Sequence, residues 1–530
     1  MVTEARLGGP TDIQSERAYQ KRVTSWAWYD WADHAYITTT ASTFFPPYFI
    51  AIAAPAFLAV GASASNQAAQ ALARDTASNI FALTVSFALF IAAILAPVVG
   101  AYADITGRRK RLLLITTVAA SLVSSLMFIL VTGMWQIGLL LYFLSQVAMN
   151  IALGFSSSLL PHVAHPQDLN RVSSLAYAMG YIGGGLLLAI NTALYLFADR
   201  LGIDSGLVVR IAFLSVGIWW LVFTLPLLIN VQEPPATPLA HGSRGSAFKD
   251  ALTRIGNTLK DARRYSELFK MLIAFWFYME GIGAIILLAT SYGAALGLNT
   301  AILIGTLLLT QFVAFPYALI YGRIPVQSSK WRSAFVSMLI WTGVTFPLMG
   351  IYANINGQIS IPMTFAMIGV DQVLGILFSV LAGRYLFAGL TGSLTTKRAV
   401  ILGLVIYTCI PIWGFFLRSQ AEFFLIGWLV GTVQGGTQAL SRTIYASLTP
   451  KAKSGEFFGL YGLSEKFAGI LGPLLYGIVG TLTHDPRASI LSISLFFFLG
   501  IYLLWKVNIE KGAQIAAAEE AQIEVLRAAD

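Results

Sequence analysis

Few ionisable side chains stand inside the long apolar runs of this sequence, and their spacing suggests proton or solute chemistry. Asp30 and Asp33 lie three residues apart at the start of one run, and Glu280 lies near the middle of another. Because a charge at the centre of a bilayer costs at least about 2.5 kcal/mol, each group needs a partner, a water-filled cavity or a shifted pKa. Two carboxylates on one helical face can share a proton. These residues therefore predict proton binding or solute recognition. For the aspartates, the alternative is hydration at the interface or pairing with an arginine or with His34.

Lys466, beside Glu465, is a further charged candidate inside an apolar run. By helical rise it lies about 15 Å from the basic end of that run. Neighbouring residues project about 100° apart, so at most one of the two faces a given target. Lys466 is expected either to form a structural charge pair with Glu280 or Asp33, or to meet a substrate carboxylate.

A polar stripe runs along a later apolar segment. Gln434, Gln438 and Arg442 follow one another at four-residue spacing, so they share one face of a helix. Such a stripe either lines a cavity that binds polar parts of a solute or joins transmembrane helices through hydrogen bonds. Arg442, near the end of the segment, is expected to act as a gate or an anchor.

Several kinds of chemistry find no support in the sequence. It contains no Walker loop, HExxH, GxSxG or paired CxxC motif, and its five histidines are dispersed. Cys409 is the only cysteine, so an intramolecular disulfide and a thiolate metal site are impossible. We therefore expect the protein not to be an enzyme and to need no metal or other cofactor.

The elements that must position these residues are membrane-spanning helices. Of the 530 residues, 57% are hydrophobic and only 11% are charged, whereas a soluble protein carries about 25% charged residues. Mean hydropathy is +0.72. A spanning helix needs roughly 20 largely apolar residues. About fourteen such runs are predicted, at 30–55, 78–101, 112–132, 136–160, 172–197, 208–231, 267–292, 299–320, 332–352, 362–387, 399–417, 421–446, 457–481 and 488–507.

The distribution of lysine and arginine predicts how these helices are oriented. When both chain ends are placed in the cytoplasm, the N-terminal segment and every second loop are basic, as at 108–111 and 232–266. Because cytoplasmic loops carry an excess of these residues, we expect a multi-pass protein of the cytoplasmic membrane with both termini inside the cell. The net charge of +9 then requires no nucleic-acid partner.

Composition also divides the chain. Residues 234–247 read as a flexible linker, and 249–270 as an amphipathic helix that lies on the membrane. The predicted parts are a cytoplasmic segment at 1–25, a six-helix half at 26–231, a linker at 232–266, a second half at 267–507 and a helix-prone, solvated tail at 508–530.

The most specific motif is GAYADITGRRKR at 100–111, in the short loop between the second and third predicted helices. Gly100 and Gly107 permit a close helix approach and a tight turn. Asp104 can accept hydrogen bonds from backbone donors at a neighbouring helix N-terminus. A mere electrostatic anchor would explain the basic residues of the motif but not Asp104 and the two glycines.

This motif resembles the signature loop of the major facilitator superfamily, which latches the two halves of those transporters in the outward-facing state. The resemblance implies an all-α polytopic membrane protein with two six-helix halves. It also implies a gating latch, which we expect to comprise Gly100, Asp104, Gly107, Arg108, Arg109 and Arg442.

Three further stretches resemble one branch of that superfamily, the autophagy-type vacuole-effluxer-like transporters. They are WAWYDWADHAYITTTASTFFPPYF at 26–49, GTVQGGTQALSRTIYASLTP at 431–450 and GEFFGLYGLSEKFAGILGPLLYG at 455–477. The chain departs from the branch pattern at Asp33, where asparagine is common, at His34, where a small residue is common, and at Glu280, where aspartate is common. The resemblance implies a small organic solute, with amino acids as the leading class.

Members of the superfamily usually have twelve helices, so two of the predicted helices are extra. Sequences resembling degraded copies of the signature loop follow the eighth and the tenth predicted helices. Residues at about 330–385 are therefore most simply an inserted hairpin, although either neighbouring hairpin is an alternative. The resemblance makes 421–446 the cavity-lining tenth helix of the family, which favours a cavity role for Gln434 and Gln438.

The sequence as a whole predicts a secondary active transporter that moves a small polar organic solute by alternating access, with proton coupling through Asp30, Asp33 and Glu280 as a hypothesis. Its expected partners are the solute, protons and the lipid bilayer, and it is expected to be a monomer. Two rival readings are a lipid flippase or scramblase, and a non-transporting membrane sensor that uses its basic loop and its tail.

Overall fold

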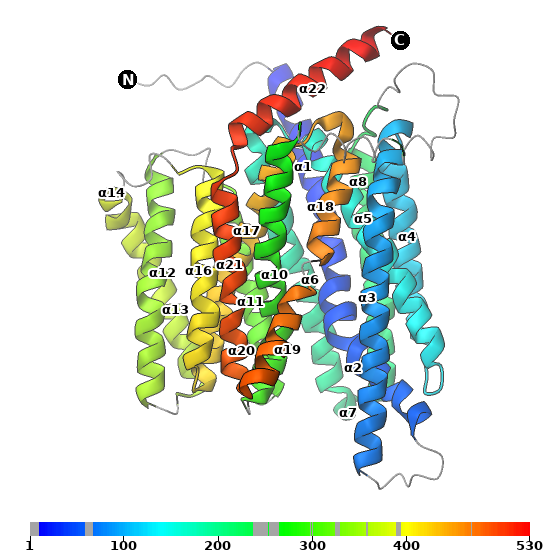
Figure 1. Ribbon diagram of the computed structural model, residues 1–530, viewed down its shortest axis with the longest axis vertical. Coiled ribbons are helices and arrows are strands. Elements are labelled where there is room, and N and C mark those ends of the chain that lie inside the picture. Colours follow the sequence, from blue (N-terminus) through cyan, green and yellow to red (C-terminus); the bar gives the residue numbers. More distant parts are fainter. Residues whose placement is uncertain are drawn as a thin grey trace.

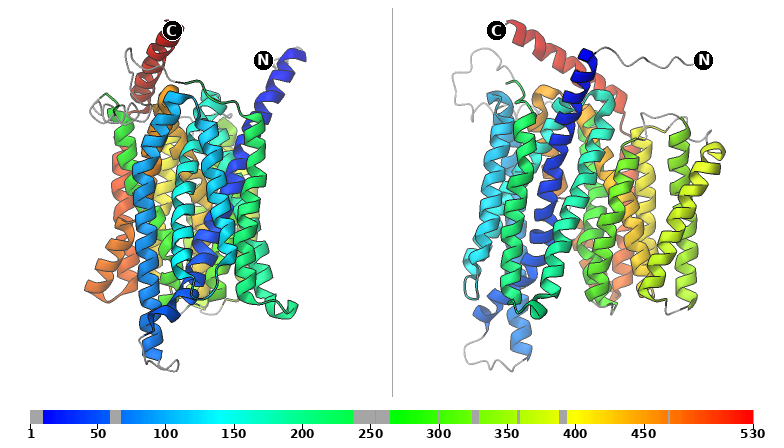
Figure 2. Two further views of the ribbon diagram at one scale, coloured as in Figure 1. Left: turned by 90° about the vertical axis from the view of Figure 1, so that its right-hand side faces the viewer. Right: turned by 180° about the vertical axis from the view of Figure 1, so that it is seen from behind.

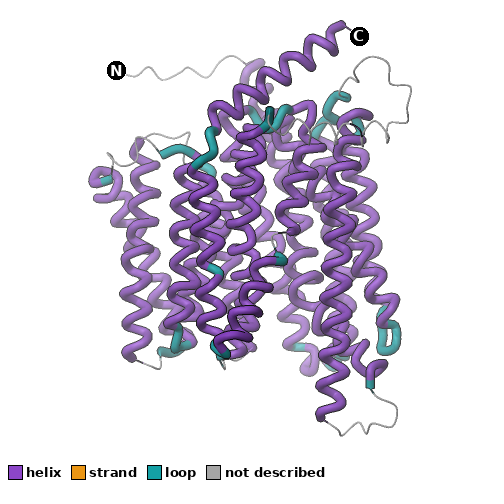
Figure 3. The backbone as a smooth tube through the Cα atoms, viewed as in Figure 1, coloured by secondary structure: helices purple, strands orange, loops and turns teal. Residues whose placement is uncertain are grey.

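The computed structural model describes residues 10–58, 67–236, 253, 264–296, 298, 300–323, 329–356, 359–387, 394–467 and 469–529. These residues form helices and short connections, and no strand occurs among them (Figures 1 and 3). Ten helices in this part of the chain are long and apolar enough to cross a membrane. The prediction of an all-helical membrane protein is confirmed.

The first part of the chain supplies one series of rods. They are α1 (Pro10–Ala35) with the π-helix η1 (Tyr36–Phe44) and α2 (Phe45–Ala53), then α3 (Gln67–Thr106), α4 (Arg109–Leu126), α5 (Trp135–Val163), α6 (Leu169–Leu196) and α8 (Ser205–Asn230). Short helices connect some of them, as α7 (Ala198–Leu201) does after α6.

The second part supplies the other series. It comprises α10 (Ser266–Ala295), α11 (Thr300–Tyr321), α12 (Ser329–Asn356), α13 (Ile361–Phe378) with the short helices η6 (Ser379–Gly383) and α14 (Arg384–Leu386), α16 (Thr396–Phe416), α17 (Gln420–Leu448), the turn η7 (Lys451–Lys453), α18 (Ser454–Phe467), α19 (Leu471–Thr483), α20 (Pro486–Ser492), α21 (Ser494–Trp505) and α22 (Ile509–Ala529). Each of the fourteen predicted spans overlaps one of these helices or helix series.

Several predicted helices differ in detail. The first helix was expected to begin at residue 30, but α1 already begins at Pro10 and continues into the π-helix η1. The span predicted at 457–481 is broken between α18 and α19, and the last span is broken at Ile493 between α20 and α21. Hydropathy cannot detect such breaks, because the residues around them remain apolar.

The start of α1 and the whole of α22 lie at the same end of the bundle, which we call the terminal face (Figure 2). The tail was expected to be solvated, but Ala516, Glu519 and Ile523 on α22 are buried. One side of this helix therefore packs against the bundle. The predicted amphipathic helix at 249–270 lies largely outside the described residues.

The outer surface of the bundle is apolar. Large hydrophobic side chains such as Leu83 on α3, Ile229 on α8 and Leu482 on α19 are mostly exposed. A soluble protein rarely exposes so much contiguous apolar surface, whereas a lipid-facing helix must do so. The helices α12 and α13 lie at one edge of the bundle, at the opposite end from α3 and α4 (Figure 1).

Candidate functional site

A buried ion pair joins α1 to α17 in the interior of the bundle. Arg442 Nη1 donates to Asp30 Oδ2 at 3.2 Å, and both side chains are 2% exposed. Such a pair is retained only when the attraction and the surrounding hydrogen bonds offset the cost of removing both charges from water. Asp30 Oδ1, however, has no hydrogen-bond partner among the described residues.

The other donors of Arg442 are directed to α6. Its Nε donates to Ser173 Oγ, and its Nη2 donates to the Ser173 carbonyl oxygen, both at 3.0 Å. The guanidinium also lies 5.0 Å from the ring centre of Trp26 and 4.4 Å from that of Tyr177. Arg442 was grouped with the gating latch, but its described contacts are with Asp30, Ser173 and these aromatic rings.

Asp33 and His34 form a second polar pair one helical turn further along α1. His34 Nδ1 lies 2.9 Å from Asp33 Oδ1, and Asp33 Oδ2 has no hydrogen-bond partner among the described residues. The imidazole meets Tyr177 and Tyr181 edge to face. Gly180 lets the ring approach α6, since a Cβ atom there would lie 2.6 Å from His34 Nδ1.

The π-helix η1 follows this pair directly. Thr38 Oγ1 donates to the carbonyl oxygens of His34 and Gly184, which ties η1 to α6. The buried hydroxyls of Thr39 and Thr40 have no hydrogen-bond partner among the described residues. π-Helical turns occur frequently at functional sites, because they widen the helix and free backbone groups.

Two polar stripes, one on α6 and one on α17, face each other. Ser173 contacts Arg442, and Tyr181 donates to Gln438 Oε1 at 2.8 Å. Gln434 is 8% exposed and lies one turn beyond Gln438. The stripe on α6 has the same four-residue spacing as that on α17, and it includes Ser173, Tyr177 and Tyr181. Sequence reasoning found only the stripe on α17, although the spacing on α6 was available as a signal.

Glu280 belongs to α10, and its carboxylate contacts the start of α19. Its Oε2 accepts a hydrogen bond from the Gly472 backbone N–H at 2.9 Å, and its Oε1 accepts one from Trp276 Nε1 at 3.2 Å. Glu280 therefore satisfies a free N–H group at the start of α19, where a carboxylate is also favoured by the helix dipole. None of the hydrogen bonds described for its carboxylate involves the aspartates of α1.

Lys466 was expected to pair with Glu280, with Asp33 or with a solute. Lys466 belongs to α18, one residue before that helix ends at Phe467. Its side chain lies outside the described residues, as does that of Glu465. The pairing of Lys466 with Glu280, Asp33 or a solute therefore stays a prediction.

The signature loop lies at the terminal face, where α3 meets α18. Asp104 Oδ1 accepts a hydrogen bond from the Gly455 N–H and Oδ2 one from the Glu456 N–H, both at 3.0 Å. Both donors belong to the first turn of α18, so Asp104 makes the helix N-terminal contact that was predicted for it. Arg109 Nε donates to Asp104 Oδ1 at 2.5 Å.

Arg109 connects this contact to the turn η7. Its Nη2 donates to the Ala452 carbonyl oxygen at 3.0 Å, and its Nη1 lies 2.6 Å from His162 Nε2 on α5. His162 Nε2 also lies 3.2 Å from Ser454 Oγ. His162 was not identified from the sequence, because an isolated histidine carries no spacing signal.

Both glycines of the signature loop occupy places that a side chain would disturb. A Cβ atom on Gly100 would lie 2.2 Å from the Gly455 carbonyl oxygen, so α3 and α18 could not approach as they do. Gly107 has φ of 61°, a left-handed conformation that favours glycine. Arg108 is exposed and makes no comparable contact with α18 in the described part of the chain.

Nothing in this region forms a metal site in the described part of the chain, where no group of three histidine, cysteine or carboxylate residues converges. The interior instead offers a cation, two carboxylates, an imidazole and two carboxamides. Such a set can bind a small charged solute and can take up or release a proton.

Comparison with solved structures gives the fold of the chain. A structure of the E. coli fucose:proton symporter FucP has a TM-score of 0.57 with this chain at 11% sequence identity, covering 93% of this chain and all of that one. The human organic anion transporter MFSD10 has a TM-score of 0.55 at 14% identity, covering 92% and 99% of the two chains. At these identities the likeness shows the fold alone, which is that of the major facilitator superfamily.

Sequence comparison then gives the branch. The family model described as "Vacuole effluxer Atg22 like" matches residues 18–170, 164–377 and 357–517, and the chain belongs to this family. An uncharacterized MFS-type transporter of Bacillus subtilis, YxiO, is 28% identical over 94% of this chain and 98% of its own length. The autophagy-related protein 22-2 of Emericella nidulans is 22% identical over 68% of this chain but only 55% of its own length. The protein is thus a multi-pass membrane transporter of the major facilitator type.

Proposed function

We propose that the protein is a proton-coupled secondary transporter of small zwitterionic solutes, with amino acids as the leading class. The observation that carries this proposal is the buried ion pair between Asp30 on α1 and Arg442 on α17. Asp30 belongs to the first half of the protein and Arg442 to the second. These two halves are proposed to move relative to each other in alternating access.

The chemistry of the ion pair favours a zwitterion. If α1 and α17 separate, each member of the pair becomes an unpaired buried charge, which is strongly unfavourable. An amino acid carries a carboxylate that can pair with Arg442 and an ammonium group that can pair with Asp30. It can therefore enter between the two side chains while both charges remain compensated.

Proton coupling is assigned in this proposal to Asp33 and His34. These two side chains are in contact with each other and lie one helical turn from Asp30 on α1. The second carboxylate oxygen of Asp33 is buried and has no hydrogen-bond partner in the described part of the chain. A proton taken up by this pair would change the charge beside Asp30 when the solute binds or leaves. Gln434 and Gln438 are proposed to contact polar parts of the solute.

The signature loop is proposed to latch the terminal face. Asp104, Arg109, Gly100 and Gly107 keep α3 and the first turn of α18 together in the arrangement described above. The basic loops support a cytoplasmic terminal face, both termini inside the cell, and a location in the cytoplasmic membrane. A monomer is sufficient for this mechanism, because both halves belong to one chain.

The domain division follows the same proposal. Residues 26–231 and 267–507 form the two halves, joined by the linker at 232–266, and 330–385 is the inserted hairpin. The edge position of α12 and α13 supports the insertion, since a hairpin added at the periphery leaves the interior of the bundle unchanged (Figure 1).

The proposal is tested with purified protein in proteoliposomes. A thermal-shift screen of amino acids, peptides, sugars and nucleosides comes first, because a bound solute stabilises the protein by mass action. Uptake of the stabilising solute is then measured with and without a pH gradient. Asp30→Asn and Arg442→Gln should abolish uptake, whereas Arg200→Gln, which changes an exposed arginine of α7, should not.

Two outcomes of this experiment would contradict the proposal. Stabilisation by sugars or nucleosides, with no effect of any amino acid, would exclude the zwitterion. Uptake that does not respond to a pH gradient, and is unchanged in Asp33→Asn and His34→Gln, would exclude proton coupling through this pair.

A further inference from the structure

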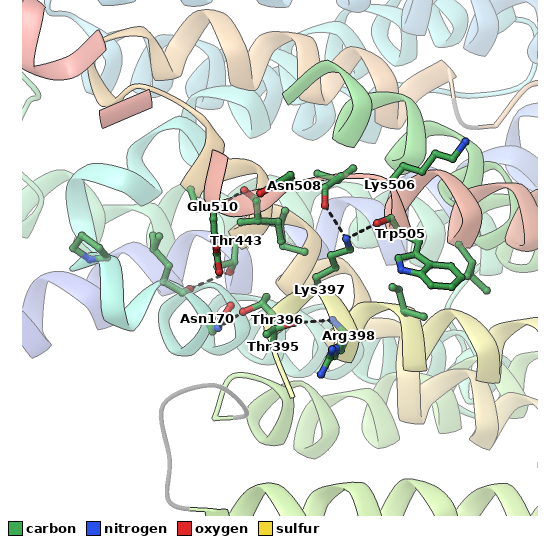
Figure 4. Close-up of a pocket in the computed structure, with 18 residues that line it drawn as sticks. Asn170, Thr395, Thr396, Lys397, Arg398, Thr443, Trp505, Lys506, Asn508 and Glu510 are labelled. Carbon is green, nitrogen blue, oxygen red and sulfur yellow. Dashed lines mark hydrogen bonds between the residues drawn. The ribbon is translucent and has the colours of Figure 1, made fainter. Parts of the chain in front are cut away.

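A separate cavity of about 1250 Å³ opens at the terminal face, away from the buried ion pair. Its walls come from the start of α6, the start of α16, the end of α17 and the connection between α21 and α22 (Figure 4). None of the predicted solute, proton or latch residues lines it. The proposed transport mechanism therefore leaves this cavity without a function.

The lining of the cavity is amphipathic. Leu169, Ile401, Ile444 and Ile501 give it an apolar wall, to which the ring of Trp505 is added. A small soluble anion would gain nothing from this apolar surface. A hydrocarbon chain would bury it from water and be stabilised by the hydrophobic effect.

The polar part of the lining is mainly cationic. Lys397, Arg398 and Lys506 contribute three positive charges, and Glu510 contributes one negative charge. Lys397 Nζ donates to the Trp505 and Val507 carbonyl oxygens at 2.6 and 2.7 Å, which leaves one of its three N–H bonds for a ligand. Lys397 belongs to the first turn of α16, and Figure 4 shows its side chain reaching the chain at the end of α21.

The position of the cavity fits the membrane interface. It lies where the apolar helices α16 and α21 reach the terminal face. Trp505 is 73% exposed and Tyr502 is 54% exposed, and Lys506 Nζ lies 4.2 Å from the Tyr502 ring centre. Exposed tryptophan, tyrosine and lysine at the end of a spanning helix are typical of the headgroup region.

We infer that this cavity binds an anionic phospholipid. Its acyl chain would lie against Ile401, Ile501 and Trp505, and its phosphate beside the three cations of the lining, Lys397, Arg398 and Lys506. The charge of the polar lining and the apolar wall are both required for this assignment. A zwitterionic lipid would satisfy the apolar wall but would leave the excess positive charge uncompensated.

The lipid would also contact α6 and α17, which pack against each other. Thr443 on α17 lines the cavity and donates to the Leu169 carbonyl oxygen on α6 at 3.3 Å. The cavity therefore exists in this form only while α6 and α17 remain in contact. An anionic lipid bound there would favour this arrangement of the two helices.

The assignment is tested by native mass spectrometry of the purified full-length protein with phosphatidylglycerol and phosphatidylcholine. Phosphatidylglycerol should bind more tightly to the wild type. Arg398→Gln/Lys506→Gln should weaken its binding by roughly twenty-five-fold, about five-fold for each charge removed, and should leave phosphatidylcholine binding unchanged. Ile401→Trp, which fills part of the cavity beside the apolar wall, should weaken the binding of phosphatidylglycerol without changing any charge.

A matched control removes two charges elsewhere on the terminal face. Arg17 and Lys21 are exposed on α1 and do not line the cavity, so Arg17→Gln/Lys21→Gln should bind phosphatidylglycerol as the wild type does. Circular dichroism and thermal unfolding in lipid-free detergent verify that every variant is folded.

Three results would overturn the assignment. The first is equal binding of the two lipids to the wild type, and the second is equal loss of binding in the cavity variant and the control variant. The third is displacement of phosphatidylglycerol by inorganic phosphate or glycerol phosphate at millimolar concentration, because the cavity would then recognise a free phosphate rather than a lipid.

Discussion

Arg442 on α17 and Asp30 on α1 are 412 residues apart in the chain, yet their side chains meet at 3.2 Å in the interior of the bundle. The guanidinium also donates twice to Ser173 on α6. One side chain thus connects three helices, and any movement of α17 relative to α1 and α6 must exchange these contacts for others.

Removing one member of this pair should destabilise the protein and stop transport. Asp30→Asn or Arg442→Gln leaves the other charge buried and uncompensated, which costs about 3–5 kcal/mol. We expect a lower midpoint of thermal unfolding and no solute uptake for each variant. The double variant Asp30→Leu/Arg442→Met should recover much of the unfolding midpoint but not the uptake. Equal midpoints for the wild type and both single variants would contradict the buried pair.

The close contact of α3 with α18 predicts the effect of a single methyl group. Gly100→Ala places a Cβ atom against the Gly455 carbonyl oxygen, where the backbone must move apart. On a Cys409→Ala background, labelling of a Ser454→Cys reporter should increase, because the terminal face opens. Gly462→Ala is the control in the same helix pair, since a Cβ atom there meets nothing within 4 Å. Unchanged labelling in Gly100→Ala would exclude a tight latch.

Two roles of Glu280 can be distinguished by mutation, that of a proton-binding group and that of a helix cap. Glu280→Gln keeps an acceptor oxygen for the Gly472 N–H, whereas Glu280→Ala removes it and should cost about 1 kcal/mol. If Glu280 is mainly a cap, Glu280→Gln should retain uptake driven by a pH gradient and Glu280→Ala should unfold at a lower temperature. Loss of gradient-driven uptake in Glu280→Gln, with solute exchange intact, would instead support the proton role predicted from the sequence.

The tail helix α22 is attached at the terminal face by ion pairs. Lys453 Nζ donates to Glu519 Oε1 at 2.7 Å, and Arg264 also pairs with Glu519. Glu520 Oε2 accepts a hydrogen bond from the Ala452 N–H, in the same turn whose carbonyl oxygen accepts from Arg109. The turn η7 therefore lies between the signature loop and the tail.

At acid pH the tail helix α22 should detach from the terminal face. Burial raises the pKa of the Glu519 carboxyl, but the hydrogen bond and charge of Lys453 outweigh burial and hold the pKa below its ordinary value of 4.5. Burial lowers the pKa of Lys453, but the hydrogen bond that Lys453 donates to Glu519 outweighs burial and holds the pKa above its ordinary value of 10.5. The stabilisation is therefore present at neutral pH, is lost as the pH falls through the lowered pKa of Glu519, and is lost in alkali only above the ordinary value of lysine.

Hydrogen exchange or limited proteolysis of α22 at a series of pH values measures this release. Glu519→Gln should increase exchange at neutral pH by about ten-fold or more, since a hydrogen bond to a charged group contributes about 1.5–3 kcal/mol. Glu524→Gln, on an exposed position of the same helix, should behave as the wild type. Exchange that is independent of pH and identical in both variants would show that the ion pairs do not hold the tail.

The sequence alone determined the class of structure, since long apolar runs must become helices when no water is available to their backbone groups. It also predicted the contact of Asp104, because Gly100, Asp104 and Gly107 form a local pattern whose geometry follows from backbone chemistry. The break before α19 adjoins Gly472 and Pro473, and proline interrupts backbone hydrogen bonding. The break at Ile493 and the π-helix η1 left no comparable signal, because hydropathy is insensitive to backbone hydrogen-bond register.

Only the tertiary structure decided which charges meet. Asp30 could have paired with any of several buried groups, and helical periodicity specifies the face of a residue but not the helix opposite it. Arg442 was expected to act as a gate or an anchor because it lies near the end of its helix, and only the packing shows that its guanidinium contacts α1 and α6. Glu280 was assigned to a proton pathway, yet its carboxylate, on α10, accepts a hydrogen bond from the Gly472 N–H at the start of α19. Pairing between distant helices depends on how whole faces pack, and a single sequence contains no measure of that.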